Sequence, residues 1–492
     1  MLYFFKKLNP KNTMRKLLSV LFILLFFSAN AQVFQLKVKI NGSNDQFLLL
    51  ANYFADKQYI TDTLKKEKSG WFKLEADSML PGGLYIVAGD KKNRYFEFLI
   101  NNEPRLSFEA DATDPVNTLK IKGSAENAAF VEYVKYLSQR QKEIEPLQKA
   151  YKRTESAWPD SAAFFKSAME RINREVVEYM NSFQSKYAGT FSAAFVKASR
   201  EPDIPETPKL PDGRPDSLFP YRYYKAHYFD NLPLDDARLL RTPFYHQRVN
   251  NYFTKMVVQH PDSIISEVKR LMPVAARTRD TYRYMVWFLT NHTERSEIMG
   301  MDAAFVYMVD NYYATGDMDY WINSTVKENL LKKAKKLKPI LLGKTAPELI
   351  MLDTLMRPVS LHSVKARYTI VLFWDPTCGH CKKEIPHLVD FMQRRGKEFD
   401  IKVFAVCTDT NMREMKKAIR QLNMNWINVN GPRAYTQNFH DLYDIYSTPV
   451  MYLLDERKTI LAKRLMTDQL ETFIERHSRN ESHGVIQMKN EE

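Results

Sequence analysis

The feature that most constrains this chain is a pair of cysteines three residues apart, placed where an apolar strand meets a helix. Residues 369–374 form a largely apolar run, and Cys378-Gly379-His380-Cys381 follows after a short loop, where a helical pattern begins. A helix N-terminus carries unpaired N–H groups and about half a positive charge, which favours a thiolate in its first turn. We therefore expect Cys378 to be the nucleophile, Cys381 the resolving thiol and His380 a supporting residue that stabilises the thiolate.

Other interpretations of the cysteine pair are weaker. A zinc knuckle needs four ligands, whereas the chain has one further cysteine, Cys407, which we expect to be a buried small hydrophobe. Attachment of c-type haem requires His directly after the second cysteine, where this chain has Lys382. A purely structural disulfide with this spacing would be strained and reducible. We expect a redox-active Cys378–Cys381 disulfide, no cofactor and no metal site.

Several motifs around the pair occur together. An aromatic pair ends in Trp374, the two cysteines follow, Glu384 comes three residues after the second cysteine, and Thr448-Pro449 lies about seventy residues further on. In this combination residues 341–480 resemble the TlpA/ResA-like, membrane-facing thiol–disulfide oxidoreductases of the thioredoxin superfamily. The resemblance implies an α/β thioredoxin-like fold, with Trp374 supporting the dithiol. It also implies a cis peptide bond before Pro449, so that Thr448 and Pro449 face the dithiol and bind substrate.

The sequence departs from that family at two positions. Many thioredoxins have a buried acid where this chain has Leu372, so the proton of the second thiol needs another acceptor. Glu384, one helical turn after Cys381, is a candidate, and a salt bridge on the helix surface is an equally good role for it. Thr377 replaces the tryptophan that usual thioredoxins carry, which changes the surface next to Cys378.

The first residues have the pattern of an export signal. Five Lys or Arg residues precede an apolar run at 17–27, and small residues at 29–31 suit a cleavage site, so residues 1–31 are predicted to be a signal peptide. Met14 is an alternative start. The apolar run is too short to span a bilayer. Without this segment the formal net charge falls from +14 to about +9, and no nucleic-acid partner is expected.

The length of 492 residues suggests a multidomain chain. Short alternating apolar runs separated by Gly, Pro and Asn turns predict an all-β sandwich or barrel at 32–123, with the sandwich preferred. This region resembles the all-β domain of unknown function that often precedes thioredoxin modules in exported Gram-negative proteins. Helical periodicity predicts an all-α region at 124–340, interrupted by a Pro-rich connector at 201–220. After the thioredoxin-like domain at 341–480, residues 481–492 form a polar tail.

These features favour an exported, periplasmic enzyme that reduces or exchanges disulfides in exported proteins. The family resemblance implies a membrane electron donor, and association with the envelope is left open. The same dithiol suits an oxidase or isomerase, because Gly379-His380 is also the pattern of disulfide isomerases. Pro376-Thr377-Cys378 is compatible with a thiol peroxidase. A non-catalytic exported binding protein with an accessory thioredoxin module is the remaining alternative.

Overall fold

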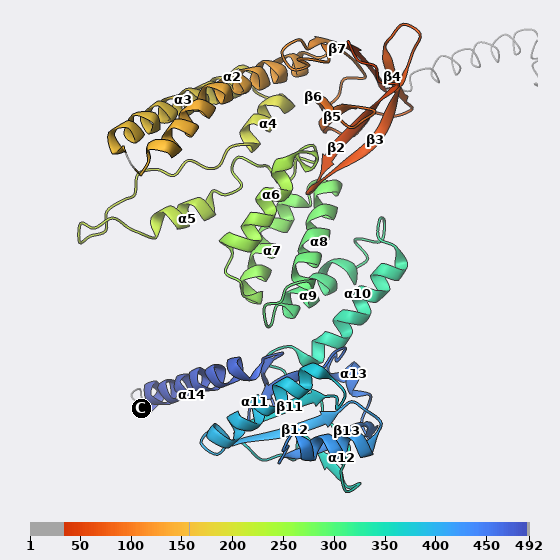
Figure 1. The fold of residues 1–492 in the computed structure, drawn as a ribbon, viewed down its shortest axis with the longest axis vertical. Coiled ribbons are helices and arrows are strands. Elements are labelled where there is room, and N and C mark those ends of the chain that lie inside the picture. The colour runs from red at the N-terminus through yellow and green to blue at the C-terminus, as the bar shows by residue number, and fades with distance from the viewer. Residues whose placement is uncertain (1–33, 157, 490–492) are drawn as a thin grey trace, which may run out of the picture. The chain divides into compact units, whose positions relative to one another are not determined.

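The computed structural model of the protein describes residues 34–156 and 158–489 (Figure 1). It divides into two compact units, one of residues up to Met256 together with Val274–Thr281, the other of Val257–Pro273 together with the chain from Tyr282 onward. The predicted signal peptide, residues 1–31, lies outside the described residues. The expected multidomain order is confirmed: an all-β domain, a helical region and an α/β domain follow one another along the chain.

The first unit begins with eight strands that are hydrogen-bonded into one sheet, in the order β6-β5-β2-β3-β4-β1-β7-β8. Most neighbours are antiparallel, and β1 runs parallel to β7. The prediction of an all-β domain is confirmed. The strands are β1 (Phe34–Asn41), β2 (Phe47–Phe54), β3 (Lys57–Lys66), β4 (Phe72–Ala76), β5 (Gly83–Gly89), β6 (Arg94–Ile100), β7 (Arg105–Asp111) and β8 (Lys120–Lys122).

This sheet curls around its own core. Phe98 in β6 and Phe108 in β7 stand near opposite ends of the strand order, yet their ring centroids are 4.8 Å apart. Phe96 in β6 also contacts Phe108, at 5.4 Å. A single apolar cluster therefore draws on all strands from β1 to β7, as in a sandwich whose two layers belong to one sheet.

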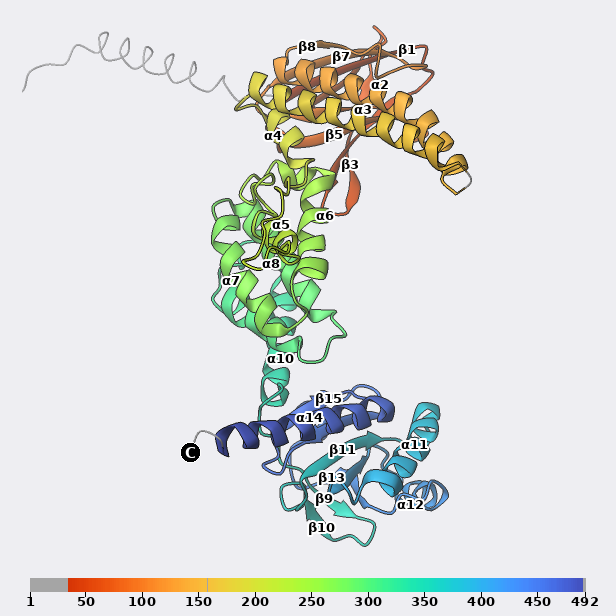
Figure 2. The ribbon, with the colours of Figure 1, turned by 90° about the vertical axis from the view of Figure 1, so that its left-hand side faces the viewer.

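Helices follow directly on the sheet. Ser124 caps α2 (Ala125–Thr154), because its side chain accepts a hydrogen bond from the N–H of Asn127. Figures 1 and 2 show α2 and α3 (Pro159–Lys186) side by side, and the rings of Tyr136 and Tyr179 stack between them at 3.7 Å. The Pro-rich connector separates α4 (Phe191–Ala198) from α5 (Phe219–Ala226), and its one β-bridge joins Lys209 to Pro215.

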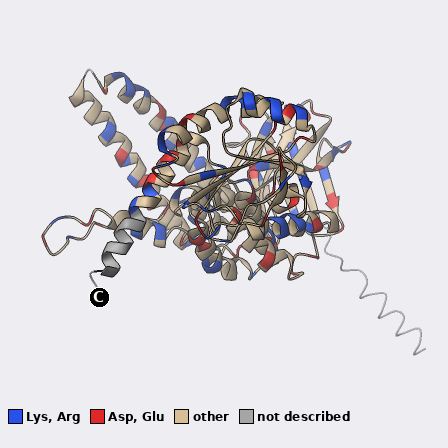
Figure 3. Cartoon of the chain, turned by 90° about the horizontal axis from the view of Figure 1, so that it is seen from below, with Lys and Arg blue, Asp and Glu red and all other residues tan. Residues whose placement is uncertain are grey.

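The remaining helical region is shared between the two units, with Val257–Pro273 and the helices from Tyr282 onward in the second. Its longer helices are α6 (Pro243–Asn251), α7 (Pro261–Ala275), α8 (Arg279–Glu294), α9 (Asp302–Met308) and α10 (Ser324–Leu337). Short 3₁₀ helices occupy Leu239–Arg241 and Lys338–Ile340, and short π-helices occupy Tyr252–Met256 and Val309–Tyr313. Lys and Arg are interspersed with Asp and Glu along the helices (Figure 3).

The second unit contains the predicted thioredoxin-like domain. Its mixed sheet has the order β10-β9-β13-β12-β11-β14-β15. Lys463, in the edge strand β15, forms a buried ion pair with Asp302 of α9 and donates to the carbonyl of Ile340 at 2.8 Å, which ties this strand to the preceding helices. The strands are β9 (Ile350–Asp353), β10 (Pro358–Ser360), β11 (Tyr368–Trp374), β12 (Ile401–Cys407), β13 (Ile427–Ala434), β14 (Val450–Leu454) and β15 (Ile460–Lys463).

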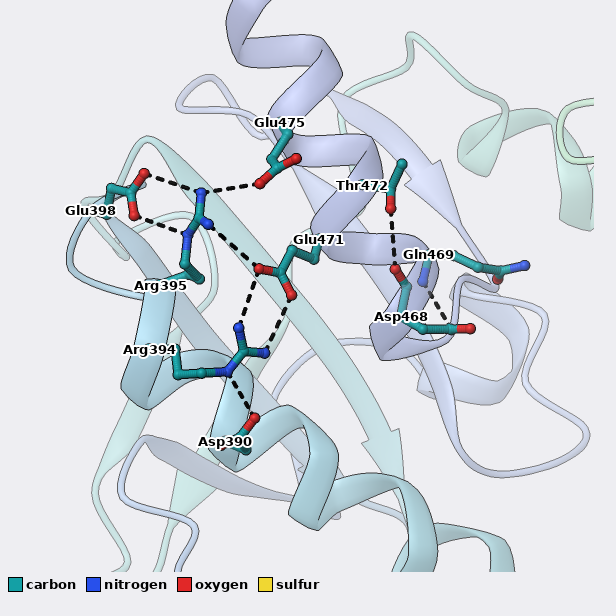
Figure 4. A network of polar contacts seen from close by, with 9 residues as sticks. All are labelled: Asp390, Arg394, Arg395, Glu398, Asp468, Gln469, Glu471, Thr472 and Glu475. Atoms are coloured by element: carbon teal, nitrogen blue, oxygen red, sulfur yellow. Dashed lines mark hydrogen bonds and ion pairs between the residues drawn. The ribbon is translucent and has the colours of Figure 1, made fainter.

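Helices of this domain are α11 (Gly379–Arg395), α12 (Met412–Gln421), α13 (Phe439–Leu442) and α14 (Thr467–Lys489). Beyond the dithiol, α11 is fastened to α14 by a network of ion pairs (Figure 4). Arg394 and Arg395 of α11 both contact Glu471, and Arg395 also contacts Glu475. Residues 481–489, which the sequence suggests as part of a polar tail, continue the helix α14.

Candidate active site

The candidate site lies where the central strand β11 ends. All seven residues of β11 are buried, and the strand pairs with β12 in parallel and with β14 antiparallel. Alternate side chains, among them Leu372 and Trp374, pack in the core beneath α11, α12 and α14. On the other face the ring of Phe373 contacts Phe439 of α13 and Tyr443. Because both faces are covered, the end of β11 is a fixed base for the loop that follows.

Cys378 stands at the N-cap of α11. Its backbone is extended (φ −67°, ψ 121°), and its sulfur accepts a hydrogen bond from the N–H of Cys381 at 3.4 Å. The thiol also donates to the carbonyl of Thr448 at 3.3 Å. Burial alone would raise the pKa of Cys378, but a hydrogen bond with the side chain of Thr448 and hydrogen bonds from the N–H groups of Cys381 and His380 outweigh it and lower that pKa.

Cys381 lies in the opposite environment. Its side chain is fully buried, and burial raises the pKa of its thiol to about 11. The N–H of Asp375 points at its sulfur from 3.5 Å. Both cysteines are free, so the structure represents the dithiol state. The pair thus combines one half-exposed thiol that ionises readily with one buried thiol that stays protonated.

Thr448 and Pro449 lie beside Cys378, although they are seventy residues further along the chain. The peptide bond between them is cis. Both residues are half-buried, and β14 begins directly after them. The geometry thus brings the two sequence-predicted substrate-binding residues together with the nucleophile.

Asp375 is a site residue that the sequence reasoning missed. Its carboxylate accepts hydrogen bonds from the N–H of Thr377 at 2.7 Å and from the hydroxyl of Thr408 at 3.4 Å. Its carbonyl accepts from the N–H of Cys378 at 3.2 Å. The available signal was an Asp directly after a buried strand and two residues before Thr377, which is the pattern of an Asx turn.

His380 and Glu384 both lie on α11. The side chain of His380 is exposed and its backbone N–H favours the Cys378 thiolate, while the predicted support from its imidazole stays a prediction. Glu384 accepts two hydrogen bonds from Thr467, one from its N–H at 2.7 Å and one from its hydroxyl at 2.6 Å. The Glu384 side chain therefore caps the start of α14. Its suggested part in proton transfer stays a prediction.

The other candidate residues are in the core. Trp374 is fully buried, and its indole N–H has no hydrogen-bond partner among the described residues. Cys407 pairs with Trp374 in the sheet register and is also fully buried, as expected, and burial raises the pKa of its thiol to about 12. Across residues 34–156 and 158–489, no three His, Cys, Asp or Glu side chains come together in a way that could hold a metal ion.

Comparison with known families divides the chain in the same way as the fold. Residues 342–463 match the AhpC/TSA family. Residues 34–130 match a domain of unknown function, DUF4369, and residues 178–336 match another, DUF5106. The dithiol therefore lies within the AhpC/TSA match, and the all-β domain and most of the helical region lie in the two domains of unknown function.

Characterised relatives share the C-terminal domain. The chain is 21% identical over 140 residues to the thiol-disulfide oxidoreductase ResA of Bacillus cereus, which covers 27% of this chain and 78% of ResA. It is 27% identical over 115 residues to ResA of Bacillus subtilis, covering 23% of this chain and 61% of that protein.

Solved structures are similar in the same region. A domain of a possible thiol-disulfide isomerase from Cytophaga hutchinsonii is 39% identical, with 30% of this chain and 98% of that domain covered and a TM-score of 0.28. A thiol:disulfide interchange protein from a Bacteroides species is 30% identical, covering 27% of this chain and 88% of that protein, with a TM-score of 0.25.

The fold and the dithiol define the C-terminal domain as thioredoxin-like. By its sequence matches the chain carries a TlpA/ResA-like thiol–disulfide oxidoreductase domain of the thioredoxin superfamily, with an all-β domain and a helical region in front of it. Among the described helices, none combines the length and the apolar character needed to cross a bilayer.

Proposed function

We propose that this protein is an exported, periplasmic oxidoreductase that reduces or exchanges disulfides of exported proteins through Cys378 and Cys381. The observation that carries the proposal is the contrast between the two thiols. Cys378 is half-exposed at the N-terminus of α11 and its pKa is lowered, whereas Cys381 is buried and its pKa is raised to about 11. The nucleophilic cysteine reacts as a thiolate, and the resolving cysteine stays protonated until the mixed disulfide has formed.

The reaction would proceed in two exchange steps. The Cys378 thiolate attacks one sulfur of the substrate disulfide, which forms a mixed disulfide and releases the other substrate sulfur as a thiolate. Cys381 then loses its proton and attacks the sulfur of Cys378, so that the Cys378–Cys381 disulfide forms and the second substrate thiolate leaves. Two electrons and two protons pass from the dithiol to the substrate. A membrane electron donor would return the enzyme to the dithiol state.

Substrate binding would use the segment at Thr448 and Pro449. Proline leaves no N–H there, and the carbonyl of Thr448 already faces the sulfur of Cys378 at 3.3 Å. An extended substrate segment that pairs with the backbone of Thr448 would therefore bring its own disulfide to the nucleophile. The exposed Thr377 leaves room beside Cys378 where thioredoxins carry a tryptophan.

Export rests on the pattern of residues 1–31, namely basic residues, a short apolar run and small residues before Gln32. The proposal requires that the mature chain starts near Gln32 and is recovered from the periplasm. Cell fractionation followed by N-terminal sequencing of the recovered protein tests this. An intact Met1 or Met14 terminus in the cytoplasmic fraction would contradict it.

The first experiment measures the reduction potential of the Cys378–Cys381 pair, together with insulin-disulfide reduction by wild type and Cys381→Ser. A potential near that of thioredoxin, about −270 mV, would support a reductant. We expect Cys381→Ser to accumulate a mixed disulfide with its substrate. Full turnover in that variant would contradict the two-step mechanism and would favour a thiol peroxidase. A complete lack of redox chemistry would favour a binding protein.

A disulfide isomerase or oxidase is the second candidate. It is favoured by the relative from Cytophaga hutchinsonii, which is described as a possible isomerase, and by Gly379-His380 between the cysteines. The same measurement separates the two candidates, because isomerases and strong oxidases have potentials of about −180 to −120 mV. An isomerase would also speed the refolding of scrambled ribonuclease, even where its rate of insulin reduction is low.

A further inference from the structure

Asp375 holds the dithiol loop from both sides. Its N–H contacts the sulfur of Cys381 at 3.5 Å, and its carbonyl accepts from the N–H of Cys378 at 3.2 Å. Its carboxylate accepts from the N–H of Thr377 and from the hydroxyl of Thr408. One residue is thus hydrogen-bonded to both cysteines through its backbone, and the same residue carries a charged group beside the dithiol loop.

The negative charge of this carboxylate is not balanced by a cation. Its hydrogen-bond donors are hydroxyl and backbone N–H groups, which are neutral, and no described Lys or Arg forms an ion pair with it. Burial would raise the pKa of Asp375, but the hydrogen bonds from Thr377, Thr408 and the N–H of Cys378 outweigh that effect and lower it. The group therefore stays ionised at neutral pH, with a field that also reaches the thiol of Cys407.

We propose that Asp375 is a positioning residue that orders the dithiol loop and, through its uncompensated negative charge, makes the Cys378–Cys381 pair a stronger reductant. The inference rests on the proposed function of that pair. Reduction of the disulfide creates a thiolate at Cys378, and a neighbouring carboxylate disfavours that second negative charge. A less stable dithiol state gives up its electrons more readily, so the potential becomes more negative.

Proton transfer from Cys381 to the carboxylate of Asp375 explains the position of Asp375 less well. The pKa of this carboxyl is below its ordinary value, whereas that of the Cys381 thiol is about 11, so the carboxylate is too weak a base for that thiol. The backbone N–H of Asp375 donates to the sulfur of Cys381, whereas its carboxylate accepts from Thr377 and Thr408. The geometry therefore assigns an electrostatic role to the carboxylate.

The test compares Asp375→Asn with Asp375→Glu. Asparagine keeps the shape and the acceptor for Thr377 but removes the charge, whereas glutamate keeps the charge. Other titratable groups around the dithiol stay in place in both variants, namely His380 and Lys382 of α11, Cys407 of β12 and Asp409 after it. As a matched control, Asp353→Asn changes another Asp that accepts backbone N–H groups in a turn, between β9 and β10.

Two readouts are measured on the full chain: the pKa of Cys378, from the pH dependence of its alkylation, and the dithiol–disulfide equilibrium with glutathione. In Asp375→Asn we expect the pKa of Cys378 to fall by about one unit and the equilibrium to shift about tenfold toward the dithiol, which corresponds to about 30 mV. Asp375→Glu and Asp353→Asn should stay within about twofold of wild type.

The outcomes separate this inference from the proposed function. Absence of redox chemistry in wild type would overturn both. An active wild type with an unchanged pKa and equilibrium in Asp375→Asn would overturn only the electrostatic role, as would a shift of equal size in Asp375→Glu, which keeps the charge. An equal shift in Asp353→Asn would also overturn it, because the effect would then belong to net charge and not to the dithiol loop.

Discussion

Strands in the two sheets of the molecule are buried to different degrees. Along β1, in the N-terminal all-β domain, buried and half-buried residues alternate at every position. Along β11, in the thioredoxin-like domain, all seven residues are buried. The difference arises because β1 packs only one face into the core of a curled sheet, whereas β11 is covered by helices on one face and by α13 with its neighbouring chain on the other.

The comparison shows what each arrangement can support. A strand with one buried face needs only an alternating sequence, and the resulting domain is stabilised by its own apolar cluster. A strand buried on both faces depends on segments distant in the chain, and its end is held firmly enough to present a reactive loop. The dithiol, its loop and Thr448 all lie at the end of β11. Substitutions in the two domains should therefore differ in their effect on activity.

The largest effect is expected for Cys378→Ser. A serine hydroxyl is not ionised near neutral pH, so insulin-disulfide reduction should fall at least about a thousandfold. Cys407→Ala is the matched control in the same domain, since Cys407 is fully buried and takes no part in the proposed exchange. Comparable activity losses in the two variants would contradict the assignment of the nucleophile.

Selective alkylation of the native dithiol form comes next. At pH 8 about a thousandth of a thiol with a pKa near 11 is ionised, so iodoacetamide should modify Cys378 more than about a hundredfold faster than Cys381 or Cys407. The rate at Cys378 should rise with pH only until its lowered pKa is passed. Mass spectrometry of peptides over a pH series measures this. Equal labelling of all three cysteines would contradict the contrast between the thiols.

Matched core substitutions compare the two sheets directly. Leu36 in β1 and Leu372 in β11 are both fully buried, so Leu36→Ala and Leu372→Ala should each cost about 2–5 kcal/mol in the free energy of unfolding. Urea titrations measure this cost. The reduction rate per folded molecule should be unchanged in Leu36→Ala and lowered in Leu372→Ala. An equal loss of activity in both variants would mean that the all-β domain contributes to the reaction.

The smallest effect concerns Glu384. Replacement by Ala removes the acceptor for the N–H and hydroxyl of Thr467 at the start of α14, and should cost about 1–2 kcal/mol in the free energy of unfolding. Thr467→Val removes one of these bonds and is the matched variant. If Glu384→Ala also slowed resolution of the mixed disulfide more than about tenfold, and Thr467→Val did not, the proton-transfer role would be supported.

Much of the reactive site can be predicted because it is local in sequence. The apolar run before the cysteines predicts β11, and the spacing of Cys378 and Cys381 places the first at the N-cap of α11, where the structure has it. Ser124 at the start of α2 is a local feature of the same kind. In each case the interacting groups lie within one helical turn, so residue type and spacing are sufficient.

Other features depend on contacts that no local pattern encodes. The strand β3 has no apolar alternation in its sequence, because nearly all its residues are exposed or half-buried. The partner of Glu384, Thr467, is 83 residues away in the sequence. Thr408, whose hydroxyl donates to the carboxylate of Asp375, lies 33 residues further along the chain. Residues 481–489 are polar in sequence and continue the helix α14.

By itself the sequence determined the order of the domains, the position of the dithiol and which cysteine comes first in the helix, because these follow from periodicity and spacing. Only the tertiary structure decided how the two thiols differ and which groups surround them. The pKa of a thiol depends on its burial and on the dipoles and charges that fold around it. In this protein these dipoles and charges come from β12, β14 and the loops that end at Thr408 and Thr448. These segments are distant in the sequence and come together only in the folded chain.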